Sequence, residues 1–292
     1  MLAAGDRSRF QLRRLVDSTK HTPLSKGLRQ AFYGWLRSST KFGICCVVFL
    51  AFVWCALFLR LVTRSPHQQR LRATALSQLM ARFLMRFLNL HCTTQLQGKA
   101  WGGVHQGLLL LPNHMSYLDV IVIAAAFPAV FVTSREIEAT PVLSAVTRAA
   151  GCVFVERRHR ADIIDDITQL SVLLNAGINV VLFPEGTTSP GDRLLEFKQT
   201  LLESAVRSRC RVVPLCLRYE RIDGHCFGTS NRDQVAWYGP MKFFPHFWQL
   251  MARRSIDVRL FVLNEVAFRG HRSRKRLTHD VKSQIEHCFF AP

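Results

Sequence analysis

The stretch Gly107–Asp119, GLLLLPNHMSYLD, carries an apolar run directly into a cluster of polar residues. The run has the length and composition of a buried β-strand, and the residues from Tyr117 onward have the apolar pattern of a helix. His114 and Asp119 then stand on either side of the start of that helix. An Asp119 carboxylate in the first turn can accept the Nδ1 proton of the imidazole and leave Nε2 free to take a proton from an alcohol. Helix caps and surface hydrogen bonds produce the same spacing, so the pair alone does not decide the chemistry.

From residue 93 onward, short apolar runs alternate with helical stretches, which indicates an α/β domain. We predict a central mixed sheet flanked by helices, preceded by N-terminal membrane-associated helices. The expected strands are residues 93–98, 107–113, 129–136, 152–157, 179–185, 211–220 and 255–267, and the expected helices are 117–127, 141–150, 161–176 and 197–206. Such sheets bind ligands at the carboxyl ends of their strands, so a site is expected in the loops that follow them.

One segment, Phe42–Leu59, contains no charged residue, and Leu61 and Val62 extend it beyond Arg60. Its length of about 18 residues is typical of a membrane segment, and a buried core helix is the alternative. It starts too far along the chain for a secretory signal and has no small-residue cleavage site, so we expect it to be retained. Basic residues flank both ends. The sequence therefore sets neither its orientation nor whether it spans the bilayer or lies in the interface.

A second N-terminal helix, Gln68–Leu90, is expected to be amphipathic, because apolar residues recur at helical spacing with arginines at other positions around the turn. A basic face opposite an apolar face suits anionic lipid headgroups, and packing on the protein's own domain is the alternative. The predicted organisation is a basic segment 1–41, a hydrophobic membrane segment 42–65, an amphipathic helix 66–92 and an α/β domain 93–292 that ends in a basic helix.

The 292-residue chain is both basic and apolar: 39 Lys and Arg against 20 Asp and Glu give a net charge of +19, and 49% of its residues are hydrophobic. This combination favours an anionic membrane surface as a partner. The basic run Arg269–Arg276 is not interleaved with aromatic residues and no nucleic-acid motif is present, so no nucleic-acid partner is expected. Nine cysteines without a C-x-x-C pair predict neither a metal site nor a disulfide framework. We expect a membrane protein whose α/β domain lies on the cytoplasmic face.

Three further strand ends carry polar blocks: Gly151–Arg157 reads GCVFVER, Phe183–Ser189 reads FPEGTTS and Val213–Leu215 reads VPL. Together with Asn113–Asp119, these ordered blocks resemble the glycerolipid acyltransferase family over about residues 90–245. The resemblance implies transfer of a fatty acyl group from acyl-CoA or acyl-carrier protein to the free hydroxyl of a lysolipid, with no resident cofactor. The first acceptor it implies is 1-acylglycerol-3-phosphate (lysophosphatidate), which would give phosphatidic acid in phospholipid biosynthesis.

Applied residue by residue, the resemblance implies that His114 is the general base and that Asp119 orients it. Arg157 resembles the family arginine that faces the acceptor phosphate, and a solvated basic loop is the alternative, since residues 158–160 are also basic. The other residues that the resemblance implies for substrate binding are Asn113, Glu185, Gly186, Thr187 and Thr188.

Thr188 departs from the commonest family pattern, because many phosphatidate-forming members have arginine there. With Phe197-Lys198 and Trp237–Met241, the EGTTS form also resembles the branch that acylates lyso-ornithine lipid, a phosphorus-free acceptor. A membrane-anchored lipid-binding protein without turnover is the alternative outside the enzymes. Substrate-dependent release of a thiol would separate the two classes.

Overall fold

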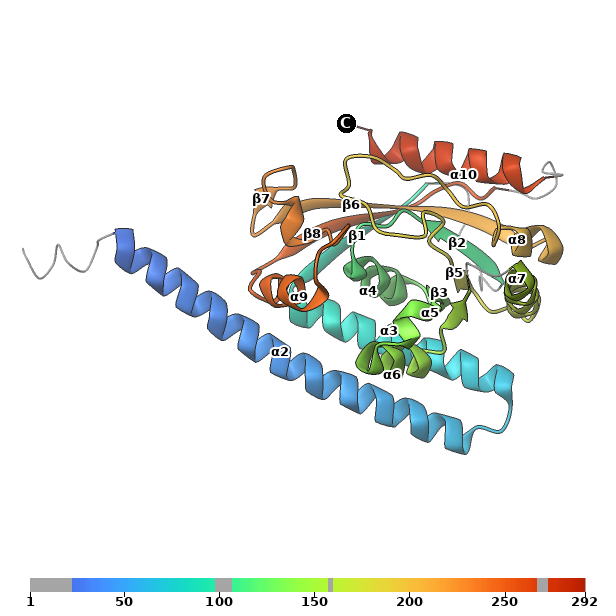
Figure 1. Ribbon diagram of the computed structural model, residues 1–292, viewed down its shortest axis with the longest axis horizontal. Helices are drawn as coiled ribbons and strands as arrows, with labels where there is room; N and C mark the ends of the chain where they lie inside the picture. The colour runs from blue at the N-terminus through green and yellow to red at the C-terminus, as the bar shows by residue number, and fades with distance from the viewer. Residues whose placement is uncertain (1–22, 98–106, 157–159, 267–272, 292) are drawn as a thin grey trace, which may run out of the picture.

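A computed structural model describes residues 23–97, 107–156, 160–266 and 273–291. In this part of the chain one sheet contains eight strands: β1 (Leu90–Leu96), β2 (Leu108–Pro112), β3 (Val130–Ser134), β4 (Val153–Val155), β5 (Val180–Val181), β6 (Arg211–Ile222), β7 (His225–Cys226) and β8 (Ile256–Val262). Their order is β1-β8-β6-β2-β5-β3-β4, with β7 paired to β6. Strand β6 runs antiparallel to β8 and β7, and the other pairs are parallel. The predicted mixed sheet is confirmed (Figure 1).

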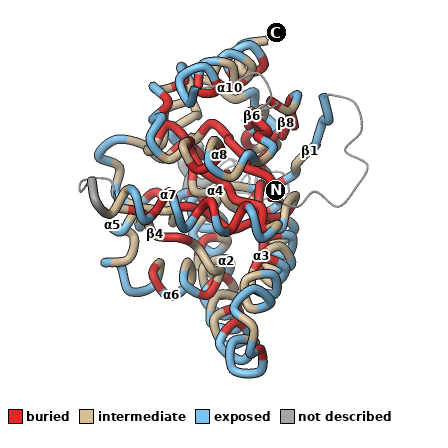
Figure 2. The backbone as a smooth tube through the Cα atoms, turned by 90° about the vertical axis from the view of Figure 1, so that its right-hand side faces the viewer, coloured by how far each residue is buried: buried red, intermediate tan, exposed pale blue. Residues whose placement is uncertain are grey.

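Helices cover both faces of the sheet (Figure 1). One face carries α2 (Pro23–Val62), α3 (Pro66–Leu88), α4 (Tyr117–Ala126) and α9 (Phe243–Met251), with α5 (Arg135–Glu138) and α6 (Pro141–Ala149) nearby. The other carries α7 (Arg160–Asn175), α8 (Glu203–Ser208) and α10 (Arg274–Phe289). A 3₁₀ turn, η1, spans Arg232–Gln234. Figure 2 shows the buried backbone gathered around the sheet and α4.

The central strand β2 explains why this sheet needs two helical layers. Leu108 and Leu110 belong to the core beneath α4, whereas Leu109 and Leu111 belong to the core beneath α7 and α10, and all four are fully buried. An uninterrupted leucine run is therefore suited to a strand covered on both faces. β2 pairs in parallel with β5 on one side and with β6 on the other. The loops that follow β2 and β5 consequently leave the sheet at the same edge, which brings the sequence blocks together.

The long helix α2 packs against α9, α3 and α6, whereas its N-terminal part extends past the domain (Figure 1). Toward its middle, Arg37 Nη1 donates to the Ala252 carbonyl (2.8 Å), and Lys41 Nζ donates to the Arg253 carbonyl (2.9 Å). Near its end, Arg60 donates to the Arg148 carbonyl of α6. The buried α2 residues between and beside these contacts are Ser38, Cys45, Phe52 and Ala56. Within the described residues α2 holds the one helical segment, Ala31–Val62, that is long and apolar enough to cross a membrane.

Several predicted boundaries were wrong for identifiable reasons. The expected helix 197–206 is helical only over Glu203–Ser208, because Phe197 is buried and Lys198 N donates to the Pro184 carbonyl, which keeps the preceding segment extended. The amphipathic helix ends at Leu88, where Asn89 adopts a left-handed conformation (φ 58°). Strand β1 then starts three residues before the expected strand 93–98. Helix α9 was not predicted.

Candidate active site

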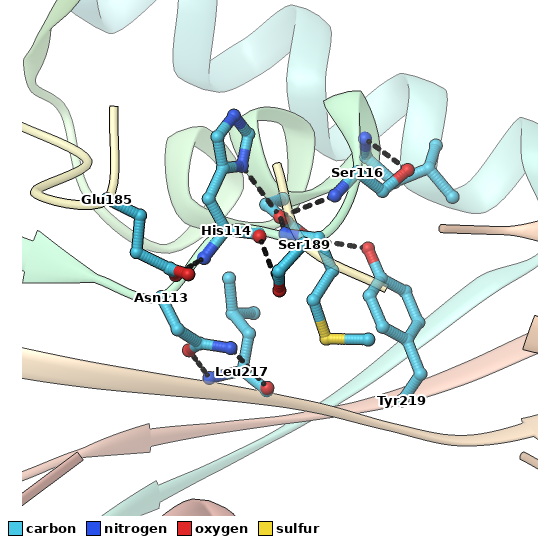
Figure 3. A network of polar contacts seen from close by, with 10 residues as sticks. Asn113, His114, Ser116, Glu185, Ser189, Leu217 and Tyr219 are labelled. Atoms are coloured by element: carbon cyan, nitrogen blue, oxygen red, sulfur yellow. Dashed lines mark hydrogen bonds and ion pairs between the residues drawn. The ribbon is translucent and has the colours of Figure 1, made fainter. Parts of the chain in front are cut away.

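The loop between β2 and α4 places His114 directly against Asp119. Ser116 is the N-cap of α4 and forms a capping box with Asp119, which fixes the carboxylate in the first turn. His114 Nδ1 lies 2.9 Å from Asp119 Oδ2 (Figure 3). The Asp119 side chain is fully buried, whereas the His114 side chain is 17% exposed. The same capping turn that starts the helix thus orients the imidazole.

Asp119 is surrounded by hydrogen-bond donors. Its Oδ2 also accepts from the main-chain N–H of Met115 (2.7 Å) and Ser116 (2.8 Å). Its Oδ1 accepts from the hydroxyl of Tyr219 on β6 (2.6 Å). A buried carboxylate needs such donors to compensate for lost hydration. Because this carboxylate only accepts, Nδ1 of His114 is assigned as the protonated nitrogen, and Nε2 carries the free lone pair.

On the side away from Asp119, the imidazole packs against an aromatic ring. The His114 ring stacks on Phe183, with ring centroids 3.8 Å apart, and Figure 3 shows its second nitrogen pointing away from the polar network. Phe183 also lines a cavity of about 270 Å³. The other residues that line this cavity are Glu156, Ile163, Leu182, Pro184, Gly186, Lys198, Thr200 and Leu201. Phe183 therefore contacts both the partly exposed imidazole and a mostly apolar pocket that contains one acidic and one basic side chain.

Glu185 fastens the turn after β5 to the histidine loop. Its Oε1 accepts from the main-chain N–H of His114 (2.7 Å), and its Oε2 accepts from the N–H of Leu195 (2.9 Å). The residue is only 2% exposed. Burial raises the pKa of Glu185 to about 7, although both N–H donors act in the opposite direction. The resemblance implies that Glu185 binds substrate. In the structure, both of its carboxylate oxygens bond main-chain N–H groups of the protein.

Asn113 joins β2 to β6 just beyond their last paired residues. Its Nδ2 donates to the Leu217 carbonyl (3.1 Å), and its Oδ1 accepts from the Leu217 N–H (2.7 Å), which extends the strand pairing by a side chain (Figure 3). Ser189 N and Ser189 Oγ both donate to the His114 carbonyl (2.9 and 3.2 Å). These contacts fix the main chain on both sides of the imidazole.

The remaining predicted site residues lie in the turn after β5 and beyond β4. Gly186 adopts a φ of 72°, which a residue with a side chain rarely adopts. Thr187 is exposed and Thr188 is half-buried. Arg157 lies outside the described residues, which stop at Glu156 and resume at residue 160.

Sequence reasoning missed Tyr219 and Phe183 as parts of this site. A signal for Tyr219 was present: residues 213, 215, 217 and 219 share one face of a strand, so the block at Val213 continues toward α4. Phe183 lies within a recognised block, but nothing in the sequence indicated that its ring would stack on His114.

Comparisons with known proteins identify the family of this chain. The sequence profile of the Acyltransferase family matches residues 89–218. A Brucella abortus protein named lyso-ornithine lipid O-acyltransferase is 31% identical over 193 residues, which cover 63% of this chain and 72% of that protein. A Neisseria gonorrhoeae protein named 1-acyl-sn-glycerol-3-phosphate acyltransferase is 39% identical over 154 residues, which cover 53% of this chain and 58% of that protein.

A solved structure shares the fold. The crystal structure of the 1-acyl-sn-glycerophosphate (LPA) acyltransferase PlsC from Thermotoga maritima superposes with a TM-score of 0.66 at 19% sequence identity, covering 89% of this chain and 96% of that one. With the family profile matched across the His114–Asp119 loop and a relative aligned over more than two thirds of its length, this chain belongs to the Acyltransferase family.

Proposed function

We propose that this protein is a lysolipid O-acyltransferase in which His114 is the general base and Asp119 orients it. The observation that carries the proposal is the 2.9 Å contact between His114 Nδ1 and the buried Asp119 carboxylate, which leaves Nε2 outside that hydrogen-bond network on a ring that stacks on Phe183. An acyl thioester, acyl-CoA or acyl-carrier protein, is the donor, and the free hydroxyl of a lysolipid is the acceptor.

The proposed reaction needs no covalent enzyme intermediate. His114 Nε2 takes the proton from the acceptor hydroxyl while its oxygen attacks the thioester carbonyl, and the tetrahedral intermediate collapses with cleavage of the C–S bond. The thiolate leaves and takes the proton from the imidazolium, which returns His114 to its starting state. Holding both substrates beside the base supplies much of the remaining rate advantage. Ser116 is not suited to be a nucleophile, because it is fully buried and its Oγ accepts from Leu118 N as a helix cap.

Lysophosphatidate is the first acceptor we propose, with phosphatidic acid as the product. The Neisseria gonorrhoeae relative, whose name states this activity, supports it. In this proposal Arg157 binds the acceptor phosphate through charge-assisted hydrogen bonds. Gly186, Thr187 and Thr188 shape the acceptor site around the turn after β5.

Lyso-ornithine lipid is the second candidate, and the cavity itself favours it. Its headgroup carries an ammonium and a carboxylate, and the cavity is lined by one anion, Glu156, and one cation, Lys198. Thr188 stands where many phosphatidate-forming members have arginine, and the Brucella abortus relative is named for this acceptor.

Two substitutions separate these acceptors. Arg157→Gln is expected to raise the KM for lysophosphatidate by roughly 10- to 100-fold, because charge-assisted hydrogen bonds are lost, and to change the KM for lyso-ornithine lipid less. Thr188→Arg is expected to favour lysophosphatidate. Steady-state kinetics of the wild type and both variants on both acceptors measure this. Turnover of lyso-ornithine lipid alone, unaffected by Arg157→Gln, would exclude lysophosphatidate as the acceptor and the phosphate role of Arg157.

We also propose that α2 lies in the membrane interface instead of crossing the bilayer, with the α/β domain on the cytoplasmic face. Arg37 and Arg60 hold α2 to the domain at points about 35 Å apart along the helix. If α2 crossed the bilayer, these arginine contacts and the part of the domain that makes them would have to lie in the hydrocarbon core. The side away from the domain is apolar, and its exposed residues include Val47, Leu50, Trp54, Phe58 and Leu61 of α2 with Leu79 and Phe83 of α3.

Trp54→Glu combined with Leu61→Glu is expected to release much of the protein from vesicles, since these side chains are 72% and 84% exposed and contact little of the protein. Inserting each into the interface contributes about 1.5–3 kcal/mol. Vesicle flotation measures the bound fraction, and Leu96→Glu is the matched control, because Leu96 is an exposed apolar residue at the end of the edge strand β1. Equal binding by the double variant and the control would contradict the proposed surface. An N-terminal tag protected in sealed vesicles that leave the α/β domain accessible would show that α2 spans.

A further inference from the structure

Strand β6 extends past the fourth sequence block and brings a tyrosine beneath the histidine loop. Val213, Leu215, Leu217 and Tyr219 alternate along β6 and belong to the core that α4 covers. The pairing of β6 with β8 shifts register between Tyr219 and Arg221. Such a bulge turns the strand locally and re-aims its side chains. Tyr219 is only 5% exposed, and its ring packs against Phe227.

The Tyr219 hydroxyl makes a specific contact with the proposed catalytic pair. It donates to Asp119 Oδ1 at 2.6 Å, on the opposite carboxylate oxygen from the one that faces His114 (Figure 3). Burial and the neighbouring Asp119 charge raise the pKa of Tyr219 well above its usual value, so the phenol stays a neutral donor.

We propose that Tyr219 is a positioning residue of the acyl transfer, the outer member of a Tyr219–Asp119–His114 hydrogen-bond chain that sets the orientation of Asp119 and the strength of the base. The inference rests on the proposed function, in which His114 Nε2 accepts the proton. Tyr219 donates its hydrogen bond to Asp119, and it acts on His114 through this carboxylate.

The chain has a definite electrostatic consequence. A hydrogen bond to Oδ1 withdraws negative charge from the carboxylate, so the imidazolium formed during the reaction is stabilised less than it would be by an unshared charge. Without the Tyr219 hydroxyl, more of the negative charge of Asp119 faces His114, so the imidazolium keeps its proton up to a higher pH. The unprotonated base is then available over a narrower pH range. Asp119 also loses one of the contacts that fix its rotamer.

Other charged groups near the imidazole must be kept constant in a test. Among the described residues they are Asp119 on α4 and Glu185 in the turn after β5, and Lys282 of α10 acts on Glu185. Burial raises the pKa of Glu185 to about 7, so this carboxyl titrates within the pH range of the test. Variants that leave Glu185 unchanged isolate the effect of the tyrosine.

The test compares pH–rate profiles of the purified full-length protein from pH 5 to 9 for the wild type, Tyr219→Phe and Tyr117→Phe. Tyr117→Phe is the matched control, because it removes a largely buried hydroxyl that bonds to His246 Nδ1 (3.0 Å) and not to Asp119. For Tyr219→Phe we expect kcat on the plateau to fall about three- to ten-fold, with KM within about two-fold, because the residue is buried and its hydroxyl is bonded to Asp119. The acid limb should move upward by about half a pH unit or more.

A Tyr219→Phe profile that matches the wild type or the Tyr117→Phe control would overturn the proposal. Should Tyr219→Phe fail to fold, 3-fluorotyrosine at position 219 decides, because it keeps the shape and donates more strongly. Its acid limb is expected to move downward, and an unshifted limb would overturn the proposal. Failure of the proposed function looks different: His114→Ala would retain full turnover whatever residue occupies position 219.

Discussion

His114→Ala is expected to lower kcat by about 10²- to 10⁴-fold while leaving the fold intact, because general base catalysis contributes a factor of this size. The imidazole makes one side-chain hydrogen bond, to Asp119, and stacks on Phe183, and its position in the fold is set by main-chain contacts to Glu185 and Ser189. Those contacts survive the substitution. The measurement is kcat for thiol release from an acyl thioester in the presence of a lysolipid, with circular dichroism to check the fold.

The chain supplies its own control for this variant. His91 Nδ1 lies 2.9 Å from Asp257 Oδ1, the same distance as in the His114–Asp119 pair, but the His91 side chain is 61% exposed on β1. His91→Ala should leave kcat unchanged. Near wild-type turnover by a folded His114→Ala protein, or equal losses in the two alanine variants, would contradict the assignment of the base.

Asp119→Asn is expected to lower both activity and stability. The new amide keeps one oxygen and replaces the other with an NH2 group that only donates. At least one of the donors to the carboxylate therefore loses its acceptor: His114 Nδ1, Met115 N, Ser116 N or the Tyr219 hydroxyl. An unsatisfied buried donor costs about 1–3 kcal/mol of unfolding free energy. Without an acceptor for Nδ1–H the useful tautomer is no longer enforced, and we expect kcat to fall by about 10²-fold or more.

Denaturant unfolding and kcat, both measured below the melting temperature of the variant, separate the two effects of Asp119→Asn. Asp257→Asn is the matched control, since that carboxylate bonds the exposed His91 and is itself partly exposed. Asp257→Asn is expected to change the unfolding free energy and kcat only slightly. A stable Asp119→Asn protein with unchanged kcat would show that the buried carboxylate neither supports the fold locally nor orients the base.

The parts of the fold that the sequence predicted are those in which a local pattern has one structural solution. The leucine run of β2 is uncharged, is long enough for a strand and ends at a proline, so a strand buried on both faces follows. The spacing of Ser116 and Asp119 is that of a capping box, which places the carboxylate in the first turn of α4 and next to His114. These rules act within about six residues.

What the sequence did not predict depends on contacts between distant segments. The contact from Tyr219 to Asp119 joins β6 to α4 across 100 residues and depends on strand order and on the bulge after Tyr219. The pattern of residues 197–206 is compatible with a helix, but burial of Phe197 and the contact of Lys198 N with Pro184 O hold its first part extended. Tertiary contacts outweigh helix propensity there.

The contacts of Asn113 and Glu185 were likewise not predictable from the sequence, although the resemblance implies a role for both residues. A motif identifies which residues recur, but not where their side chains point. In the structure both side chains bond main-chain groups, Asn113 to Leu217 and Glu185 to His114 and Leu195. Such contacts hold the loop that carries His114. They cannot be predicted from a single sequence, because each partner is a backbone amide or carbonyl.

The central claim is tested most directly by incubating purified protein with acyl-CoA or acyl-carrier protein and a panel of lysophosphatidate, other lysophospholipids and lyso-ornithine lipid. Free thiol is measured together with the acylated lipid, by mass spectrometry. We predict that thiol release requires a lysolipid and that one acylated lipid forms for each thiol released. A folded, membrane-bound protein that releases no thiol in response to any acceptor, with either donor, would contradict the account and leave a lipid-binding protein without turnover.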